Sequence, residues 1–369
     1  PPRSTLFPYT TLFRSGTLTG DPELQVTDVI TDSRNINVTG GLVFFAISGK
    51  HHDGHSFLES LYNVGVRVFI VERLPSEISG FHGAAIIVTD NSVKALQLLA
   101  AHVRKTFRSP VIAVTGSAGK TIVKEWLADI LGMSVPVVRS PRSYNSQTGV
   151  PLSVLKLDEK YKYGIFEAGI SLPGEMDRLK EIIEPDIGII TNIGDAHSEN
   201  FSSIEEKAAE KLRLFADSPV LIYCRDHKII HDLIISRKIC NQELLIDWSA
   251  GSDEAAIKVT KESAGGGRTK IRMTFNNREY HFIIPFIDRA SVDNAITVAC
   301  VCLALGTNEE TIRKGLASLV SVAMRMEMKA GINNCQLIED YYNSDPGSLG
   351  MALDYLRVQN NRKRTLVLS

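Results

Sequence analysis

A glycine-rich segment between an apolar run and a helical stretch has the residues needed to bind a polyphosphate. The segment reads V-T-G-S-A-G-K-T and spans Val114–Thr121. Gly116 and Gly119 would let the backbone turn tightly, so that successive N–H groups and the positive end of the following helix point at phosphate oxygens. The predicted phosphate-binding residues are Gly116, Ser117, Ala118, Gly119, Lys120 and Thr121.

The last two residues of this loop carry its predicted chemistry. The ammonium group of Lys120 would reach the β and γ phosphates, and the hydroxyl of Thr121 would ligate Mg²⁺. Val114 stands where the wider pattern G-x-x-x-x-G-K-[ST] has glycine, which indicates a shorter loop and a distinct subclass of P-loop enzyme. A strand-to-helix turn that binds no phosphate is the alternative interpretation.

Two further polar clusters follow the next apolar runs. They are F-E-A-G at Phe166–Gly169 and T-N-I-G-D-A-H at Thr191–His197. Ligands of open parallel sheets bind at the carboxyl ends of the strands, so we expect Glu167 and His197 to converge on the phosphate loop. Taken singly, Glu167 could equally be a helix cap or a solvated acid, and His197 a hydrogen-bonded loop residue.

An α/β fold with a mainly parallel sheet is needed to position these clusters. From Val111 onward, apolar runs alternate with loops and helical stretches in the order of βαβ units. The expected strands are Val111–Thr115, Tyr163–Phe166, Ile187–Thr191, Val220–Tyr223 and Leu244–Ile246, then Ile257–Thr260, Ile271–Phe275 and Tyr280–Ile284 in a hairpin-like section. Ala264–Arg268, with the sequence A-G-G-G-R, is expected to be a hairpin loop. Helices are expected at Ala290–Leu305 and Glu309–Leu319.

The chain separates into three blocks. Residues 16–108 have the short apolar runs of a small N-terminal α/β domain, residues 109–330 form the central phosphate-loop domain, and residues 331–369 begin a third block. The expected elements outside the central block are strands at Leu42–Ile47, Val66–Val71, Ala84–Val88 and Gln336–Ile338, and a helix at Ser348–Arg357.

Both ends of the chain differ from the rest. Pro1–Ser15 lacks an initiating Met and a clear periodicity, so we interpret it as a non-native segment. Arg364–Ser369 is predicted to open a buried strand whose partners are missing, which indicates a truncated third domain.

Composition and charge narrow the class of protein. The 369 residues are 44% hydrophobic and 22% charged, as in a folded globular protein of two or three domains. The net charge of −1 gives no global field for nucleic acid or an anionic membrane. The five cysteines form no C-x-x-C pair, and no signal peptide or membrane-spanning run is evident. We therefore expect a cytoplasmic protein that neither binds nucleic acid nor inserts into a membrane.

The motifs together resemble the Mur ligase family, the ATP-dependent amide-forming enzymes of peptidoglycan synthesis. The similarity rests on the phosphate loop, on the two clusters after the strands and on A-A-E-K-L-R-L-F at Ala208–Phe215. It extends from about Thr27 to the end of the chain. The segments Ser143–Pro151, Glu167–Glu175 and Asp340–Pro346 are most similar to the members that add D-alanyl-D-alanine.

The resemblance implies roles for residues around the phosphate loop. Lys120 and Thr121 would hold the phosphates of ATP and one Mg²⁺ shared with Glu167, and His197 would ligate a second Mg²⁺. Lys211 matches a lysine that the family carbamylates with CO₂, although the sequence alone favours a solvated charge. Asn294 matches an adenine-side asparagine, and Arg325 and Asp340 match residues near the phosphates and the ribose.

The resemblance also implies where the nucleotide-sugar substrate binds. Residues 16–108 would be the UDP-binding domain, and the candidate substrate residues are Ser33, Arg34, Lys50, Asp53, His55, Asn145 and Gln147. Asp53 with Gly54 could equally form an ordinary turn. Two departures from the family pattern, Ile122 and Asp195, remove no ligand.

The implied activity is an ADP-forming ligase that supplies cell-wall precursors and so supports cell shape and division. It would join D-alanyl-D-alanine to UDP-N-acetylmuramoyl-tripeptide through an acyl phosphate, as a monomer. The alternatives are a sibling ligase that adds another amino acid, a folylpolyglutamate-type ligase, and a non-catalytic nucleotide-binding fragment. Because little of the closing domain is present, we expect the chain to bind nucleotide but to turn over slowly.

Overall fold

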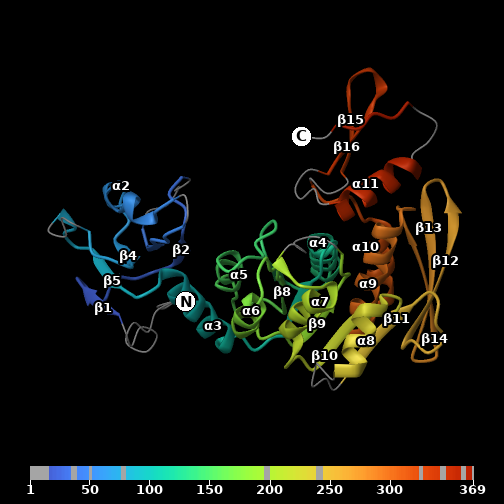
Figure 1. Cartoon of the computed structure of the whole chain (residues 1–369), viewed down its shortest axis with the longest axis horizontal. Helices are drawn as coiled ribbons and strands as arrows, with labels where there is room; N and C mark the ends of the chain where they lie inside the picture. The colour runs from blue at the N-terminus through green and yellow to red at the C-terminus, as the bar shows by residue number, and fades with distance from the viewer. Residues whose placement is uncertain are drawn as a thin grey trace. The chain divides into compact units, whose positions relative to one another are not determined.

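The computed structural model divides the chain into two compact units, which are described separately (Figure 1). The first unit contains the residues up to Arg108 together with Gln147–Leu157, and the second contains Ser109–Ser146 and the residues from Asp158. The structure describes residues 16–34, 40–49, 52–75, 80–194, 200–237, 244–323, 327–340, 346–358 and 363–367.

The first unit is a five-stranded sheet with helices on both faces. Its strand order is β1-β5-β4-β3-β2, parallel except for β1. Its elements are β1 Thr17–Thr19, β2 Asp28–Ile30, β3 Leu42–Phe45, η1 Gly54–Phe57, α2 Leu58–Asn63, β4 Val68–Val71, β5 Ala85–Val88, α3 Ser92–Thr106 and α5 Gly149–Val154. Alternate residues of β3 face opposite sides, so Val43 packs in the cluster of α3 and Phe44 in the cluster of α2.

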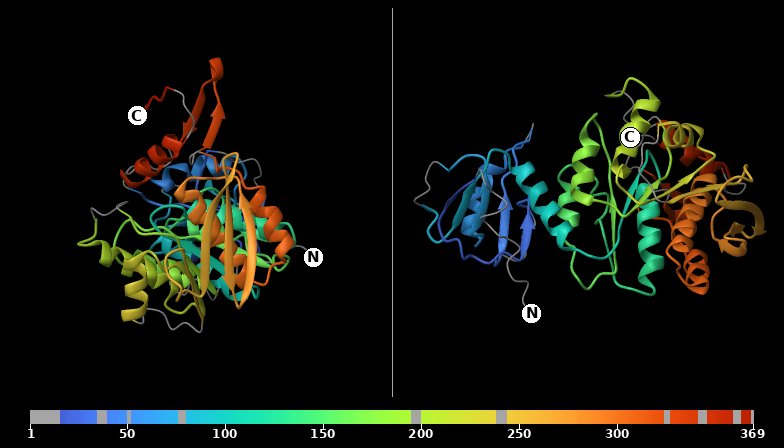
Figure 2. Two further views of the ribbon diagram at one scale, coloured as in Figure 1. Left: turned by 90° about the vertical axis from the view of Figure 1, so that its right-hand side faces the viewer. Right: turned by 90° about the horizontal axis from the view of Figure 1, so that it is seen from below.

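The second unit contains a nine-stranded sheet in the order β14-β13-β12-β11-β10-β9-β6-β8-β7. The sheet is parallel from β7 to β12, and β12, β13 and β14 form antiparallel hairpins whose long strands stand side by side in Figure 2. Its strands are β6 Val111–Thr115, β7 Val137–Arg139, β8 Tyr163–Glu167, β9 Ile187–Ile190, β10 Val220–Cys224, β11 Leu244–Ser249, β12 Ile257–Gly265, β13 Arg268–Phe275 and β14 Arg278–Ile284.

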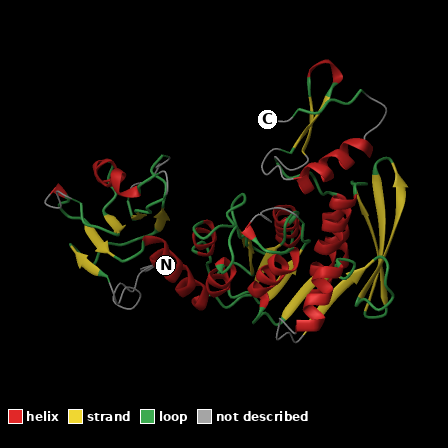
Figure 3. Ribbon diagram, viewed as in Figure 1, coloured by secondary structure: helices red, strands yellow, loops and turns green. Residues whose placement is uncertain are grey.

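Helices cover both faces of this sheet (Figure 3). They are α4 Lys120–Gly132, α6 Glu175–Ile183, α7 Ile204–Leu212, η4 Arg213–Phe215, α8 Lys228–Arg237, α9 Arg289–Ala304 and α10 Glu309–Ala317. The main core packs α4 and α9 against alternate residues of the strands, including Ile187 and Ile189 of β9. Gly188, between them, faces the other way, and a Cβ there would lie 2.4 Å from the Phe215 ring. The missing side chain therefore lets η4 pack directly on the sheet.

The last part of the second unit holds a two-stranded sheet and one helix. Its elements are β15 Glu327–Ala330, η5 Ile332–Asn334, β16 Gln336–Glu339 and α11 Pro346–Val358. Tyr355 of α11 is buried in the same apolar core as α4 and α9. No helix within the described ranges combines the length and the apolar character that a membrane span requires.

The predicted α/β class with mainly parallel strands is confirmed, and most expected strands match to within a few residues. The A-G-G-G-R hairpin is also confirmed, because Gly266 and Gly267 form the turn with φ of +59° and +72°. The short strands β1, β2, β7 and β15 were not expected.

The strand predicted at Arg364–Ser369 is not formed by the described residues 364–367. They form no strand, and Val367 is 84% exposed. An apolar run forms a strand only where a neighbouring strand can accept its backbone hydrogen bonds. None of the described strands pairs with these residues.

Candidate active site

The phosphate loop lies between β6 and α4 and depends on two glycines. Gly116 has φ of +145°, and a Cβ there would lie 2.0 Å from Thr191 Oγ1. Gly119 has φ of +81°, and its Cβ would lie 2.5 Å from Asn294 Oδ1. A side chain at either position would force neighbouring groups apart, and Gly119 additionally adopts a left-handed conformation that other residues disfavour. The predicted tight turn is therefore present, and α4 begins directly after it at Lys120.

The segment after β9 supports this loop from the side. Ser117 N donates to Asn192 O at 2.8 Å, and Ala118 N donates to Asn192 Oδ1 at 3.0 Å. Thr191 Oγ1 donates to Ala118 O at 2.5 Å, and Gly194 N donates to Ser117 Oγ at 2.9 Å. The T-N-I-G part of the second polar cluster thus positions the loop, a role that sequence reasoning did not assign to it.

Oxygen ligands meet at the first turn of α4. Thr121 Oγ1 donates to Glu167 Oε2 at 2.8 Å and lies 3.2 Å from Ser143 Oγ. Asn145 Nδ2 donates to the other carboxylate oxygen, Glu167 Oε1, at 2.6 Å. Glu167 is buried at the carboxyl end of β8, beside β6 in the sheet. The expected convergence of Thr121 and Glu167 is therefore present, whereas His197 lies outside the described residues.

Three lysines donate hydrogen bonds to backbone carbonyl groups in and beside the loop, and two of them, Lys207 and Lys211, are buried. Lys120 Nζ and Lys211 Nζ both donate to Gly116 O, at 2.9 and 3.2 Å, and Lys120 Nζ also donates to Ser117 O at 3.1 Å. Lys207, one helical turn before Lys211 on α7, donates to Gly194 O. Burial holds the pKa of Lys211 well below its ordinary value, and the charges of Lys120 and Lys207 lower it further. Burial and nearby cations thus favour a neutral amine at Lys211.

Asn294, on α9, contacts the loop at Gly119 and is buried. Asp340 follows β16 and is half-buried. Lys50 and Arg325, like His197, fall outside the described residues, so their predicted roles stay predictions.

Two of the candidate substrate residues of the first unit, Asp53 and His55, contact each other. His55 Nδ1 lies 2.7 Å from Asp53 Oδ1, and its Nε2 accepts a hydrogen bond from Glu72 N at 2.9 Å. Asp53 also caps η1 and pairs with Arg73, and its hydrogen bonds to His55 lower its pKa. Arg34 pairs with the exposed Asp32 at 2.6 Å.

Two of the candidate substrate residues are close in sequence but belong to different units. Gln147 accepts hydrogen bonds from Gln97 of α3, and Asn145 contacts Glu167. Ser33, which precedes Arg34 in the chain, is half-buried.

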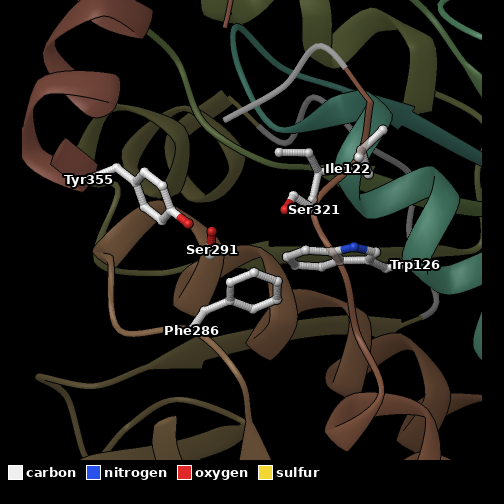
Figure 4. Close-up of a pocket in the computed structure, with 7 residues that line it drawn as sticks. Ile122, Trp126, Phe286, Ser291, Ser321 and Tyr355 are labelled. Atoms are coloured by element: carbon white, nitrogen blue, oxygen red, sulfur yellow. The ribbon is translucent and has the colours of Figure 1, made fainter. Parts of the chain in front are cut away.

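A small apolar pocket lies on α4 beyond Thr121 (Figure 4). The Trp126 and Phe286 rings stack at 5.2 Å, and Figure 4 shows the Tyr355 hydroxyl directed toward Ser291. The pocket is lined by Ile122, Trp126, Phe286, Ser291, Ser321, Val322 and Tyr355. It therefore joins α4 and α9, the helices that carry Thr121 and Asn294.

The donor atoms near Thr121 suit a hard divalent cation. A hydroxyl, a carboxylate and a second hydroxyl, from Thr121, Glu167 and Ser143, lie together, and Mg²⁺ prefers oxygen ligands of this kind. Among the described residues no group of three or more His, Cys, Asp and Glu side chains gathers to hold a metal. Phosphate oxygens and water would supply the remaining ligands.

Comparison with known proteins gives three findings. The Mur ligase middle domain matches residues 114–302. The UDP-N-acetylmuramoyl-tripeptide–D-alanyl-D-alanine ligases of Bacillus subtilis and Rickettsia prowazekii are 29% and 30% identical, over 96% and 87% of this chain and 76% and 71% of those proteins. A crystal structure of MurF from Acinetobacter baumannii superimposes with a TM-score of 0.81 at 27% identity, covering 92% of this chain and 73% of that one.

Proposed function

This chain belongs to the Mur ligase family, and from that premise we propose that it joins D-alanyl-D-alanine to UDP-N-acetylmuramoyl-tripeptide with ATP as the energy source. The observation that carries the proposal is the meeting of three groups at one sheet edge. Lys120 lies on the phosphate loop, Thr121 follows it, and the Glu167 carboxylate contacts Thr121 at 2.8 Å. Relatives that carry this activity in their names match nearly the whole chain.

The reaction must first activate a carboxylate, whose delocalised charge makes it a poor electrophile. One carboxylate oxygen of the tripeptide attacks the γ phosphorus of ATP, and the bond to the β–γ bridging oxygen breaks to release ADP. The amine of D-alanyl-D-alanine then attacks the acyl carbon, loses a proton and expels phosphate. No protein nucleophile is needed for either step.

The loop and its lysine act on the charge that develops during phosphoryl transfer. Backbone N–H groups of the Gly116–Thr121 loop and the Lys120 ammonium would bind the phosphates and reduce their repulsion of the incoming carboxylate. Thr121 and Glu167 would hold Mg²⁺, with His197 as the proposed ligand of a second ion. When bound, Mg²⁺ supplies Lewis-acid neutralisation of the phosphate charge. The adenine end of ATP would lie toward Asn294 and the pocket on α4.

Lys211 is proposed to carry a carbamate. CO₂ reacts with a neutral amine, and burial, which lowers the pKa of Lys211, raises the fraction of that form. Carbamylation would place an anion beside the ammonium groups of Lys120 and Lys207, and the opposite charges would attract. The resulting carboxylate would help to position the cations and the γ phosphate.

The first unit is proposed to bind the UDP end of the substrate. The support is the resemblance of Thr31–Arg34 and the Asp53–His55 segment to the family's UDP-binding domain. Ser33, Arg34, Lys50, Asp53 and His55 remain the candidate residues there. A monomeric, cytoplasmic enzyme that does not bind nucleic acid also remains a prediction.

An assay with both substrates tests this function. The chain is mixed with ATP, Mg²⁺, UDP-N-acetylmuramoyl-tripeptide and D-alanyl-D-alanine, and both phosphate release and the mass of the amide product are measured. We expect product only when all components are present, and a fall of about 10²–10³-fold for Lys120→Ala. Lys314→Ala changes an exposed lysine on α10 and is the matched control.

Three results would contradict the proposal in different ways. Product with another amino acid in place of D-alanyl-D-alanine would indicate a sibling ligase. Product with a folate substrate would indicate a folylpolyglutamate-type ligase. Binding of ATP and of the UDP-sugar without phosphate release would identify a nucleotide-binding fragment.

A further inference from the structure

Lys124, on α4, has a buried ammonium group that contacts the backbone of Ser140 and Arg142. Its side chain is 0% exposed, and Nζ donates to Ser140 O at 2.8 Å and to Arg142 O and lies 2.8 Å from Glu125 Oε1. An ammonium has three N–H donors, and these three acceptors match them. Because an unmatched buried charge is costly, the contacts rather than apolar packing account for a lysine here.

Arg142 has a backbone conformation that needs such support. Its φ is +49°, in the left-handed region that residues with a side chain disfavour. The Arg142 side chain is exposed, while its carbonyl oxygen accepts the hydrogen bond from Lys124. The buried ammonium therefore holds the backbone at the point where the chain bends.

The bent segment, Ser140–Asn145, reaches the proposed cation site at both ends. Ser140 Oγ accepts a hydrogen bond from Glu167 N at 3.2 Å, and Asn145 Nδ2 donates to Glu167 Oε1 at 2.6 Å. Between them, Ser143 Oγ lies 3.2 Å from Thr121 Oγ1. Any relaxation of the bend would move groups that contact Thr121 and Glu167.

We propose that Lys124 is a positioning residue, whose buried ammonium keeps the Ser140–Asn145 segment in the conformation that orients Glu167 and Thr121. The role in catalysis rests on the proposed ligase function, while the effect on the segment does not. Lys124 touches neither substrate nor cation in this account and acts only through the segment.

Lys124→Met tests the proposal, because it keeps the length of the side chain and removes the charge and the donors. We expect faster amide hydrogen exchange confined to Ser140–Asn145. We also expect kcat to fall about 10–100-fold, as when other groups that orient metal ligands are removed. The KM for ATP should change less than about threefold, because Lys120 and the loop glycines are untouched. Lys314→Met, at an exposed lysine, is the matched control and should leave both measurements unchanged.

Arg142→Gly in the Lys124→Met background separates positioning from a general folding defect. Glycine adopts a φ of +49° without strain. The double variant should therefore recover exchange protection in Ser140–Asn145 and most of the kcat that Lys124→Met loses. Lys124→Gln, which keeps one donor group, takes the place of Lys124→Met if the latter does not fold.

Either of two results overturns the proposal. The first is unchanged exchange in Ser140–Asn145, and the second is a loss of activity that Arg142→Gly does not relieve. If the unaltered chain makes no amide, the ligase proposal fails, yet the exchange comparison still decides whether Lys124 holds the segment.

Discussion

Charged side chains gather in two regions of this protein. The two regions differ in how far their charged groups are exposed to water, and therefore in how strongly these groups affect one another. In the first unit, Asp32 pairs with Arg34 at 2.6 Å, and both side chains are more than half exposed. In the second unit, Lys120 and Lys211 donate to one carbonyl oxygen, and Lys211 is buried. Water screens the first pair, so it stays an ordinary ion pair. Lys211 lacks that screening, so burial and the charge of Lys120 lower the pKa of its amine.

A pKa shift matters for reactivity only where it changes the protonation form of a group near neutral pH. The hydrogen bonds from Arg34 lower the pKa of Asp32 to about 2. At neutral pH this changes nothing, because an Asp carboxyl with its ordinary pKa is already ionised there. Burial lowers the pKa of Lys211, which raises the fraction of the neutral amine, the form that can react with CO₂. The buried region is therefore where substitutions should have large effects.

The largest expected effect comes from removing the amine of Lys211. Lys211→Met should lower the rate of amide formation about 10²–10³-fold, because a carboxylate near the cations and the γ phosphate is lost. The unaltered chain should also lose activity in CO₂-depleted buffer and regain it with bicarbonate, which the variant should not do. Equal rates with and without CO₂ would contradict the carbamate.

The next effect concerns the cation site. Glu167→Gln keeps the shape of the side chain and removes its charge, so Mg²⁺ should bind about 10–100-fold more weakly in the presence of ADP. Titration calorimetry with MgCl₂ measures this. Asp32→Asn, an equivalent change in the exposed region, is the control and should leave Mg²⁺ binding as it was.

A smaller effect is expected from the loop backbone. Gly119→Ala places a Cβ 2.5 Å from Asn294 Oδ1 at a φ of +81°, which should lower the free energy of unfolding by about 1–3 kcal/mol. Chemical denaturation measures the loss. Gly174, also at a left-handed φ of +79° but with no atom within 4 Å of its Cβ, is the matched position, so Gly174→Ala should cost less.

The smallest effects are on the pH dependence of stability. The two regions should change the stability of the fold in different pH ranges. In CO₂-depleted buffer, where Lys211 is a free amine, its lowered pKa in the folded chain means that the unfolded chain binds the extra proton between that pKa and 10.5, so stability rises with pH. For Asp32, stability is present above its ordinary pKa of 3.8 and is lost as pH falls toward about 2.

Thermal unfolding across both pH ranges checks these slopes. Lys211→Met should remove the alkaline slope. Asp32→Asn should reduce the stability that is lost in acid by less than about 1 kcal/mol, because the pair is exposed. An alkaline slope that persists in Lys211→Met would show that another group controls it.

The local motifs of the site could be predicted from the sequence. The glycine spacing at Gly116 and Gly119 dictates a tight turn, and the rule for parallel sheets brings Glu167 to Thr121. Short strands such as β7 were missed because three residues carry too little periodicity. The apolar run that begins at Arg364 was predicted to lack partner strands, and its described residues form no strand.

Long-range roles could not be predicted. Thr191 and Asn192 support the phosphate loop through contacts more than 70 residues away in sequence, and no local pattern marks such contacts. Lys124 looks like any helix lysine, since only the fold shows that its ammonium is buried against the Ser140–Asn145 segment.

We propose above all that ATP bound at this loop phosphorylates the carboxylate of UDP-N-acetylmuramoyl-tripeptide. Positional isotope exchange tests it most directly, using ATP that carries ¹⁸O in the β–γ bridge. Reversible acyl phosphate formation frees the β phosphate of ADP to rotate, so the label should move to non-bridging β positions. We predict this exchange with tripeptide substrate and Mg²⁺ but without D-alanyl-D-alanine, and its loss in Lys120→Ala. A bridge label that stays in place in the unaltered chain would contradict the account.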